Sequence, residues 1–171
     1  MAKRPTKEST RKTFSDEQRL KLLVVDEDSE DLNYYAGVLR YLGYDVRSMN
    51  SYARAAALLG KECFDLVIVD QGSSDFEGRS VLTRAVEVDR HVPVLVLTRT
   101  VDADCCIDAL DSGAHEYVQK PLTTAEVREL VADYLTSSPG MFSASHVYPI
   151  RQNAAGSGDE EAEPDFLRRA S

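Results

Sequence analysis

The chain has 171 residues, of which 43% are hydrophobic and 29% charged, as expected for an ordinary soluble protein with one main domain. No apolar run approaches the length of a membrane-spanning helix, and the first 19 residues lack the apolar core of a secretion signal, so neither a membrane protein nor a secreted one is expected. The formal net charge of −9 arises mainly in residues 22–135, where ten Lys and Arg stand against twenty-one Asp and Glu, and such an acidic region would repel nucleic-acid phosphates, so no direct DNA binding is expected.

Strand and helix signals alternate along residues 20–136. Short apolar runs mark the strands, and apolar residues at every third or fourth position mark the helices. Gly43 stops one helix, Ser51 can cap the next, and Thr123 with Glu126 forms a capping box before the last. In chain order, the expected elements are a strand over 20–25, a helix over 29–42, a strand over 44–49, a helix over 51–59, a strand over 66–69, a helix over 79–89, a strand over 93–98, a helix over 102–112, a strand over 115–119 and a helix over 123–135.

Five successive strand–helix units predict an α/β fold with a parallel sheet and right-handed crossovers. The domain is expected over residues 20–136, between an N-terminal arm and a C-terminal tail. The basic arm, residues 1–19, could contact nucleic acid or anionic lipid but is more typical of a flexible, solvated segment. The tail, residues 137–171, is rich in Ser, Ala and Gly and is also expected to be flexible, so no output domain is expected to follow.

Polar residues stand at the C-terminal ends of the expected strands. They are Asp26 and Glu27 after the first strand, Asp70 after the third, Thr98 at the end of the fourth and Lys120 after the fifth. Because the carboxyl ends of parallel strands lie at one edge of a sheet, these side chains are expected to converge. Crowded carboxylates repel one another, and hard oxygen ligands of this kind suit Mg²⁺. One carboxylate could then act as a nucleophile toward phosphorus, while the ammonium and hydroxyl groups hold phosphoryl oxygens.

Each of these residues also has a simpler interpretation. Asp26 or Asp70 could merely cap a helix or a turn. Thr98 could simply end a strand, and Lys120 could be a solvated surface charge. The combination of all of them, in this order and spacing, favours a shared site.

Four segments together resemble the receiver domains of two-component response regulators: LLVVDED, FDLVIVD followed by eight residues to Gly78, PVLVLT, and SGAHEYVQKPL. The resemblance covers residues 20–136. It implies a flavodoxin-like (βα)5 doubly wound parallel sheet with strand order 2-1-3-4-5. It also implies that a histidine kinase or a histidine phosphotransfer protein donates a phosphoryl group to Asp70.

The resemblance further assigns roles to the residues of the expected site. Asp70 would be the phospho-acceptor. The Mg²⁺ ligands would be Asp26, Glu27, Asp70 and the backbone carbonyl of Gly72. Thr98 and Tyr117 would be the switch residues, and Lys120 would be the invariant lysine. The family's cis peptide bond would precede Pro121.

The output implied by the resemblance is a change in protein–protein contacts. Movement of Thr98 toward the phosphoryl group would vacate space for the Tyr117 ring and alter the face formed by residues 102–135. A downstream protein or a second copy of the chain would bind that face. The alternative is that Tyr117 is merely a half-buried aromatic residue on an outer strand.

Three positions depart from the family pattern. Glu27 stands where Asp is usual, so Mg²⁺ is expected to bind more weakly or in a displaced position. Ser73-Ser74 replaces the usual Met-Pro pair, which alters the stiffness and packing of the loop. Glu77 replaces an Asp before Gly78. None of these changes removes a group that phosphotransfer needs.

Phosphorylation is therefore the favoured function, and two alternatives belong to other classes. One is a pseudo-receiver that binds partners without being phosphorylated. The other is a small flavin- or nucleotide-binding protein of the flavodoxin type. This second alternative is disfavoured because the acidic stretch DEDSED stands where a phosphate-binding loop would be needed.

The remaining chemically notable residues carry no motif. Cys63, Cys105 and Cys106 form neither a disulfide framework nor a spaced metal motif, which suits a reducing, cytoplasmic compartment. All three are expected to be small hydrophobic residues of the core. The histidines are expected to be structural or exposed; they are His91, His115 and His146.

Overall fold

The structure, a computed structural model, describes residues 19–135, so the predicted arm and tail lie outside it apart from residue 19. Strands and helices alternate throughout this part. They are β1 (Lys21–Val25), α1 (Ser29–Tyr41), β2 (Asp45–Met49), α2 (Tyr52–Leu59), β3 (Leu66–Asp70), α3 (Arg79–Val88), β4 (Val94–Thr98), α4 (Ala103–Asp111), β5 (Glu116–Gln119) and α5 (Thr124–Leu135). The element ends expected from the sequence agree with these to within one residue.

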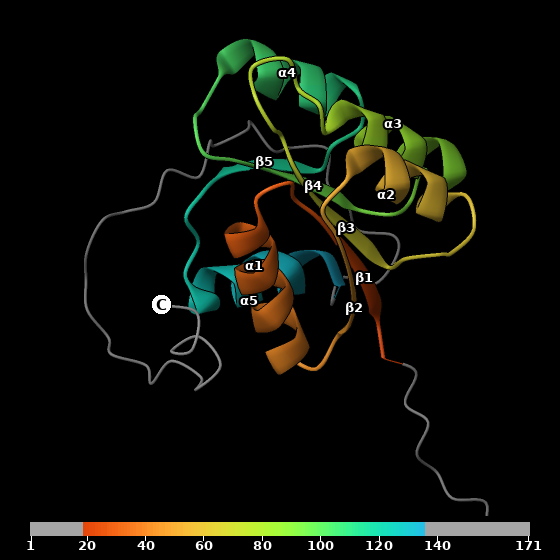
Figure 1. Cartoon of the computed structure of the whole chain (residues 1–171), viewed down its shortest axis with the longest axis vertical. Coiled ribbons are helices and arrows are strands. Elements are labelled where there is room, and N and C mark those ends of the chain that lie inside the picture. The colour runs from red at the N-terminus through yellow and green to blue at the C-terminus, as the bar shows by residue number, and fades with distance from the viewer. Residues whose placement is uncertain (1–18, 136–171) are drawn as a thin grey trace, which may run out of the picture.

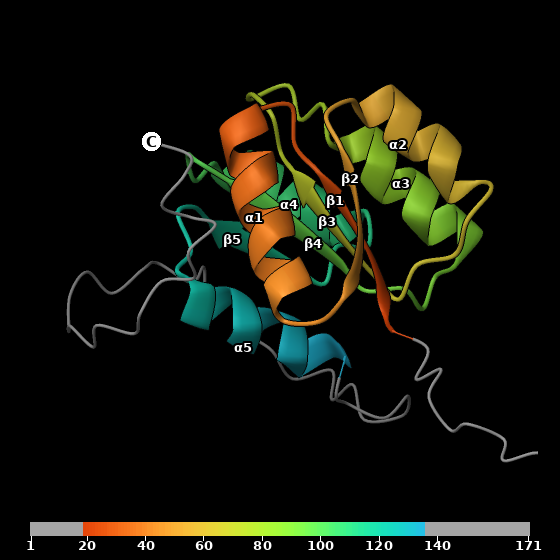
Figure 2. The same ribbon diagram turned by 60° about the horizontal axis from the view of Figure 1, so that its bottom comes forward.

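The five strands form one parallel sheet in the order β2-β1-β3-β4-β5, which confirms the expected flavodoxin-like topology (Figure 1). Helices α1 and α5 cover one face of the sheet, and α2, α3 and α4 cover the other (Figure 2). The C-terminal ends of β1 and β3 are adjacent because these two strands pair directly, with Val25 opposite Val69. This pairing brings the residues that follow, Asp26 and Asp70, to the same edge.

Alternation along the strands produces two cores. In β1, for example, Leu22 and Val24 point toward α1 and α5, whereas Leu23 and Val25 point toward α2 and α3, and all four are at most 1% exposed. The strands are apolar on both faces because both faces are covered by helices. This is why LVIVD in β3 reads as a continuous apolar run until it reaches its terminal carboxylate.

Side-chain caps set the helix starts. Asp28, rather than Asp26, caps α1, with its Oδ1 accepting from the backbone N–H groups of Glu30 at 2.9 Å and Asp31 at 3.2 Å. The Thr123–Glu126 capping box before α5 is confirmed, because the Thr123 N–H donates to Glu126 Oε2 at 2.7 Å. Asp26 therefore does not cap the helix, although its Oδ1 accepts from the Asp28 N–H at 2.9 Å and so supports the turn before it.

The cysteine expectation is right for two residues and wrong for one. Cys105 and Cys106 are buried in the core on α4, but Cys63 is exposed. Cys63 lies in the turn between α2 and β3, where the helical pattern that buries apolar side chains has already ended. Among the described residues, no helix has the length and apolarity needed to cross a membrane.

Candidate functional site

Three of the five side chains expected to converge, those of Asp26, Asp70 and Lys120, meet at the carboxyl edge of the sheet, whereas, within the part of the chain that the structure describes, no ion pair or hydrogen bond joins Thr98 or Glu27 to them. Lys120, which directly follows β5, is only 6% exposed and lies among carboxylates that follow β1, end β3 and begin α1. Its ammonium Nζ lies 2.6 Å from Asp26 Oδ2, 2.6 Å from Asp70 Oδ1 and 2.9 Å from Asp31 Oδ2. Lys120 is therefore not a solvated surface charge, and all three of its protons have carboxylate partners.

Asp31 is a member of this cluster that the sequence analysis missed. It lies in the first turn of α1, and its Oδ2 also accepts from Arg99, at 2.9 Å from Nη2. Arg99 bridges in addition to Asp28 Oδ2 at 2.8 Å, so it ties the end of β4 to the start of α1. Two signals could have identified the pair: Asp31 lies in the first turn of the helix that follows β1, and Arg99 directly follows Thr98 at the end of β4.

Burial and charge act in opposite directions on this cluster. Burial raises the pKa of Asp26, the hydrogen bond and charge of Lys120 oppose the rise, and the charge of Asp70 adds to it. Burial alone would lower the pKa of Lys120, but hydrogen bonds to Asp26 and Asp70, together with their charges, raise it above its ordinary value. Lys120 is consequently a permanent cation at neutral pH.

The second oxygen of Asp70 is also occupied. Its Oδ2 accepts from the backbone N–H of Gly72 at 2.7 Å and from the Tyr52 hydroxyl at 3.2 Å. Tyr52 is the first residue of α2 and is 6% exposed. Sequence reasoning placed Tyr52 only on a helix, because no periodicity relates the start of α2 to the end of β3.

The loop between β3 and α3 is held by the residues that replace the family's usual ones. Glu77 accepts from Ser73 twice, at 2.7 Å from the backbone N–H and at 2.7 Å from the hydroxyl. Gly72 has a φ of +85°, and a Cβ there would lie 2.3 Å from Glu77 Oε2. At Gly78 a Cβ would lie 2.1 Å from the Asp70 carbonyl oxygen, so the chain can pass this close to the acceptor only without a side chain.

The two expected switch residues lie in an arrangement that the sequence did not predict. Thr98 is 1% exposed, and its hydroxyl donates to the Thr100 carbonyl at 2.7 Å. Tyr117 is 3% exposed rather than half-buried, although β5 is an outer strand. Its hydroxyl donates to Oε1 of the buried Gln71, a residue that sequence analysis did not single out. Burial raises the pKa of Tyr117, and a hydrogen bond with Thr98 partly opposes the rise.

The chemistry of the donor set fits a hard divalent cation. Carboxylates of Asp26 and Asp70 converge with mutual repulsion, which a cation would relieve, and Glu27 lies beside them on the exposed side. Within residues 19–135, however, no group of three or more His, Cys, Asp or Glu side chains is arranged to hold a metal ion. In this arrangement the ammonium of Lys120 supplies the countercharge.

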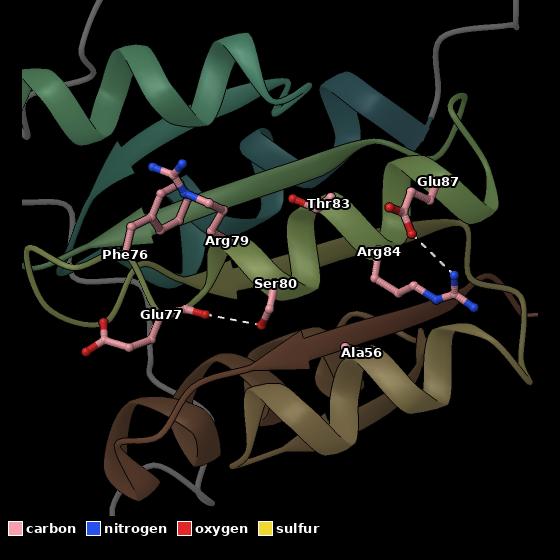
Figure 3. A pocket seen from close by; sticks show the side chains of 8 residues that line it. All are labelled: Ala56, Phe76, Glu77, Arg79, Ser80, Thr83, Arg84 and Glu87. Carbon is pink, nitrogen blue, oxygen red and sulfur yellow. Dashed lines mark hydrogen bonds and ion pairs between the residues drawn. The ribbon is translucent and has the colours of Figure 1, made fainter.

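A groove between α2 and α3 lies apart from these groups (Figure 3). Ala56 of α2 faces Ser80 and Thr83 of α3 across it, and at one end the Arg79 guanidinium stands 5.5 Å from the centroid of the Phe76 ring. None of the residues that converge on Lys120 lines this groove. The reactive cluster is thus at the sheet edge and not in the groove.

Comparison with known proteins gives one family. A profile of the response regulator receiver domain matches residues 22–132. The transcriptional regulatory protein ZraR of Escherichia coli K12 is 32% identical over 101 residues, which are 59% of this chain and 23% of ZraR. The response regulator protein PilR of Pseudomonas aeruginosa is 31% identical over 117 residues, which are 68% of this chain and 26% of PilR. The chain therefore spans about a quarter of the length of these two relatives.

Solved structures agree with this result. A receiver domain from Clostridium thermocellum has a TM-score of 0.63 at 27% identity, covering 68% of this chain and 94% of that one. A response regulator from Burkholderia pseudomallei, whose structure contains a phosphorylated aspartic acid, a calcium ion and citrate, has a TM-score of 0.60 at 26% identity, covering 67% of this chain and 66% of that one. Because the family profile covers most of the chain and nearly all of the described fold, the chain belongs to the family of response regulator receiver domains.

Proposed function

We propose that this chain accepts a phosphoryl group on Asp70 from the phosphohistidine of a histidine kinase or a histidine phosphotransfer protein. An oxygen of the Asp70 carboxylate attacks phosphorus, the phosphorus–nitrogen bond breaks, and the imidazole leaves with the bonding electron pair and is protonated by solvent. The observation that carries the proposal is the 2.6 Å contact between Asp70 Oδ1 and Lys120 Nζ at the end of β3. The phosphorylated aspartic acid in the Burkholderia relative supports it.

Lys120 and Thr98 would hold the phosphoryl oxygens. All three protons of Lys120 are engaged, so one partner has to be released when the phosphoryl group arrives. Asp31 is the natural one to leave, because its contact of 2.9 Å is the longest of the three and Arg99 remains bonded to it. The Thr98 hydroxyl would turn from the Thr100 carbonyl toward the phosphoryl group.

Asp26, Glu27, Asp70 and the carbonyl of Gly72 would hold Mg²⁺. When bound, this ion neutralises negative charge on the phosphoryl oxygens. The charge of the site argues for such an ion, because Lys120 faces three carboxylates before any phosphoryl group arrives, and only Asp31 has a second cationic partner, Arg99. The Burkholderia structure contains a calcium ion together with a phosphorylated aspartic acid, which supports the proposal of a divalent cation in this chain. The cytoplasmic location and the absence of DNA binding stay predictions.

The phospho-acceptor assignment can be tested with a small phosphodonor. The full chain is incubated with acetyl phosphate and Mg²⁺, and its intact mass is measured. We expect one added phosphate in the wild type and none in Asp70→Asn. Asp75→Asn is the matched control, because Asp75 is an exposed carboxylate of the same loop and should leave labelling unchanged. Persistent labelling of Asp70→Asn would refute the assignment.

The output would leave through the face formed by residues 102–135. Ile107 on α4 is 59% exposed on this face, which is unusual for a large apolar side chain and suits a contact surface. We expect this face to bind a downstream protein or a second copy of the chain more tightly after phosphorylation. Association is measured with and without beryllium fluoride, in the wild type and in Thr98→Ala. Equal association in all four conditions would exclude this face as the output.

One observation favours a phosphorylation-independent pseudo-receiver as the second candidate. Tyr117 is already buried, with its hydroxyl bonded to Gln71, although no phosphoryl group is present. A ring that is already inside has no vacated space left to fill when Thr98 moves. If beryllium fluoride changes neither association nor the environment of Tyr117, the pseudo-receiver is the better description.

A further inference from the structure

The carboxylate of Asp70 has too few free lone pairs for the work that the proposed function requires of it. Its two oxygens offer about four lone-pair positions. Lys120 takes one on Oδ1, while the Gly72 N–H and the Tyr52 hydroxyl take both on Oδ2. One position remains, on Oδ1. Ligation of a cation by one oxygen and attack on phosphorus by the other cannot both proceed until a donor withdraws from Oδ2.

Tyr52 is the donor that can withdraw. Its contact of 3.2 Å is longer than the 2.7 Å contact of the Gly72 N–H, which belongs to the backbone of the loop and cannot turn away. A neutral phenol donor at this distance also contributes less than the ammonium of Lys120 at 2.6 Å. The Tyr52 hydroxyl is therefore the weakest of the three ties on Asp70.

The position of the hydroxyl relative to the other expected ligands supports the same reading. A Cβ added to Gly72 would lie 3.2 Å from it, so it stands against the segment whose carbonyl is expected to bind the cation. Burial and then the charge of Asp70 raise the pKa of Tyr52, and the charges of Glu27 and Asp26 add to the rise. The hydroxyl is thus bonded to Asp70, stands beside Gly72, and lies close enough to Glu27 and Asp26 for their charges to act on it.

We propose that Tyr52 is a positioning residue that occupies the cation-facing oxygen of Asp70 and must release it before a divalent cation can bind there. This inference rests on the proposed function. The phenol would compete with the cation and would keep the carboxylate ordered while the cation is absent. Tyr52 thereby sets the affinity for the cation without being one of its ligands.

The test is a Mg²⁺ titration of the full chain, followed by backbone amide chemical shifts in the absence of any phosphodonor. Tyr52→Phe keeps the buried ring and removes only the hydroxyl. We expect it to bind Mg²⁺ about fivefold more tightly than the wild type, the change expected for removal of one competing hydrogen bond. Tyr134→Phe is the control. Tyr134 lies on α5, away from the site, and its hydroxyl donates to another carboxylate, Glu116 Oε2, at 2.9 Å.

Equal or weaker Mg²⁺ binding by Tyr52→Phe overturns the inference, and so does an absence of binding in both proteins. A gain equal to that of Tyr134→Phe overturns it as well. Labelling by acetyl phosphate at several Mg²⁺ concentrations separates this inference from the proposed function. Labelling with the same Mg²⁺ dependence in the wild type and in Tyr52→Phe rejects the inference and keeps the proposed function. Tighter Mg²⁺ binding by Tyr52→Phe with no labelling of either protein keeps the inference and rejects the proposed function.

Discussion

Replacing Lys120 with methionine tests whether this one ammonium holds the carboxylate cluster together. Methionine keeps most of the length and apolar volume of the lysine, so the change leaves little cavity. It removes the shared partner of Asp26, Asp70 and Asp31, which lie 2.6, 2.6 and 2.9 Å from Nζ. Removing one partner of a buried ion pair costs about 3–5 kcal/mol, because the remaining charge is left without compensation.

For Lys120→Met, the structure favours a loss of free energy of unfolding near the lower end of that range. Only Asp26 is as deeply buried as Lys120, each with a side chain 4% exposed, whereas the side chains of Asp70 and Asp31 are 13% and 26% exposed. Asp31 also keeps its bond to Arg99. We therefore expect Lys120→Met to lower the free energy of unfolding by about 3 kcal/mol at neutral pH without divalent cations.

The assay is urea unfolding followed by far-ultraviolet circular dichroism, with a chelator present. A second variant, Asp26→Asn combined with Lys120→Met, removes the most buried carboxylate charge and should recover part of the loss, since the two sites are in direct contact. Added Mg²⁺ should stabilise Lys120→Met more than the wild type, because the cation would replace the missing charge. A loss below about 1 kcal/mol, or no recovery in the double variant, would refute the idea that Lys120 neutralises the cluster.

Three further predictions follow from single residues. Gly78→Ala should lower the free energy of unfolding by about 2 kcal/mol or more, measured by thermal unfolding, because the new Cβ would lie 2.1 Å from the Asp70 carbonyl oxygen. Gly43→Ala, with nothing within 4 Å of its new Cβ, should lose only about 1 kcal/mol from the strain of its φ of +98°, and equal losses in the two variants would contradict this reasoning. Burial lowers the pKa of His115, so the unfolded chain binds a proton there before the folded one does as the pH falls. The free energy of unfolding should therefore decrease below about pH 6.5, and less steeply in His115→Gln. Urea unfolding at several pH values tests this, and the same pH dependence in both proteins would rule it out. Glu27→Asp should tighten Mg²⁺ binding in the same chemical-shift titration, and an unchanged affinity would mean that the exposed loop absorbs the extra methylene.

Much of the fold could be predicted from the sequence because its signals are local. The alternation of short apolar runs with helical periodicity determines the element order, and Ser51 and the Thr123–Glu126 box mark helix starts that the structure confirms. Convergence of Asp26, Asp70 and Lys120 followed from one topological fact, that parallel strands end at the same edge. Their convergence could therefore be predicted without knowing how the helices pack against the sheet.

The tertiary structure alone decided which other groups complete the cluster. Asp31 reaches Lys120 across 89 positions of sequence, and Tyr52 reaches Asp70 from the start of a helix on the opposite face of the sheet from α1. Such contacts depend on how far each helix is shifted and rotated against the sheet, which periodicity does not specify. The burial of Tyr117 is of the same kind, because its partner Gln71 lies in a loop whose conformation is set by Gly72 and by the Ser73–Glu77 hydrogen bonds. Alternation specifies which face a side chain takes, but only the packed structure specifies which polar atom it meets there.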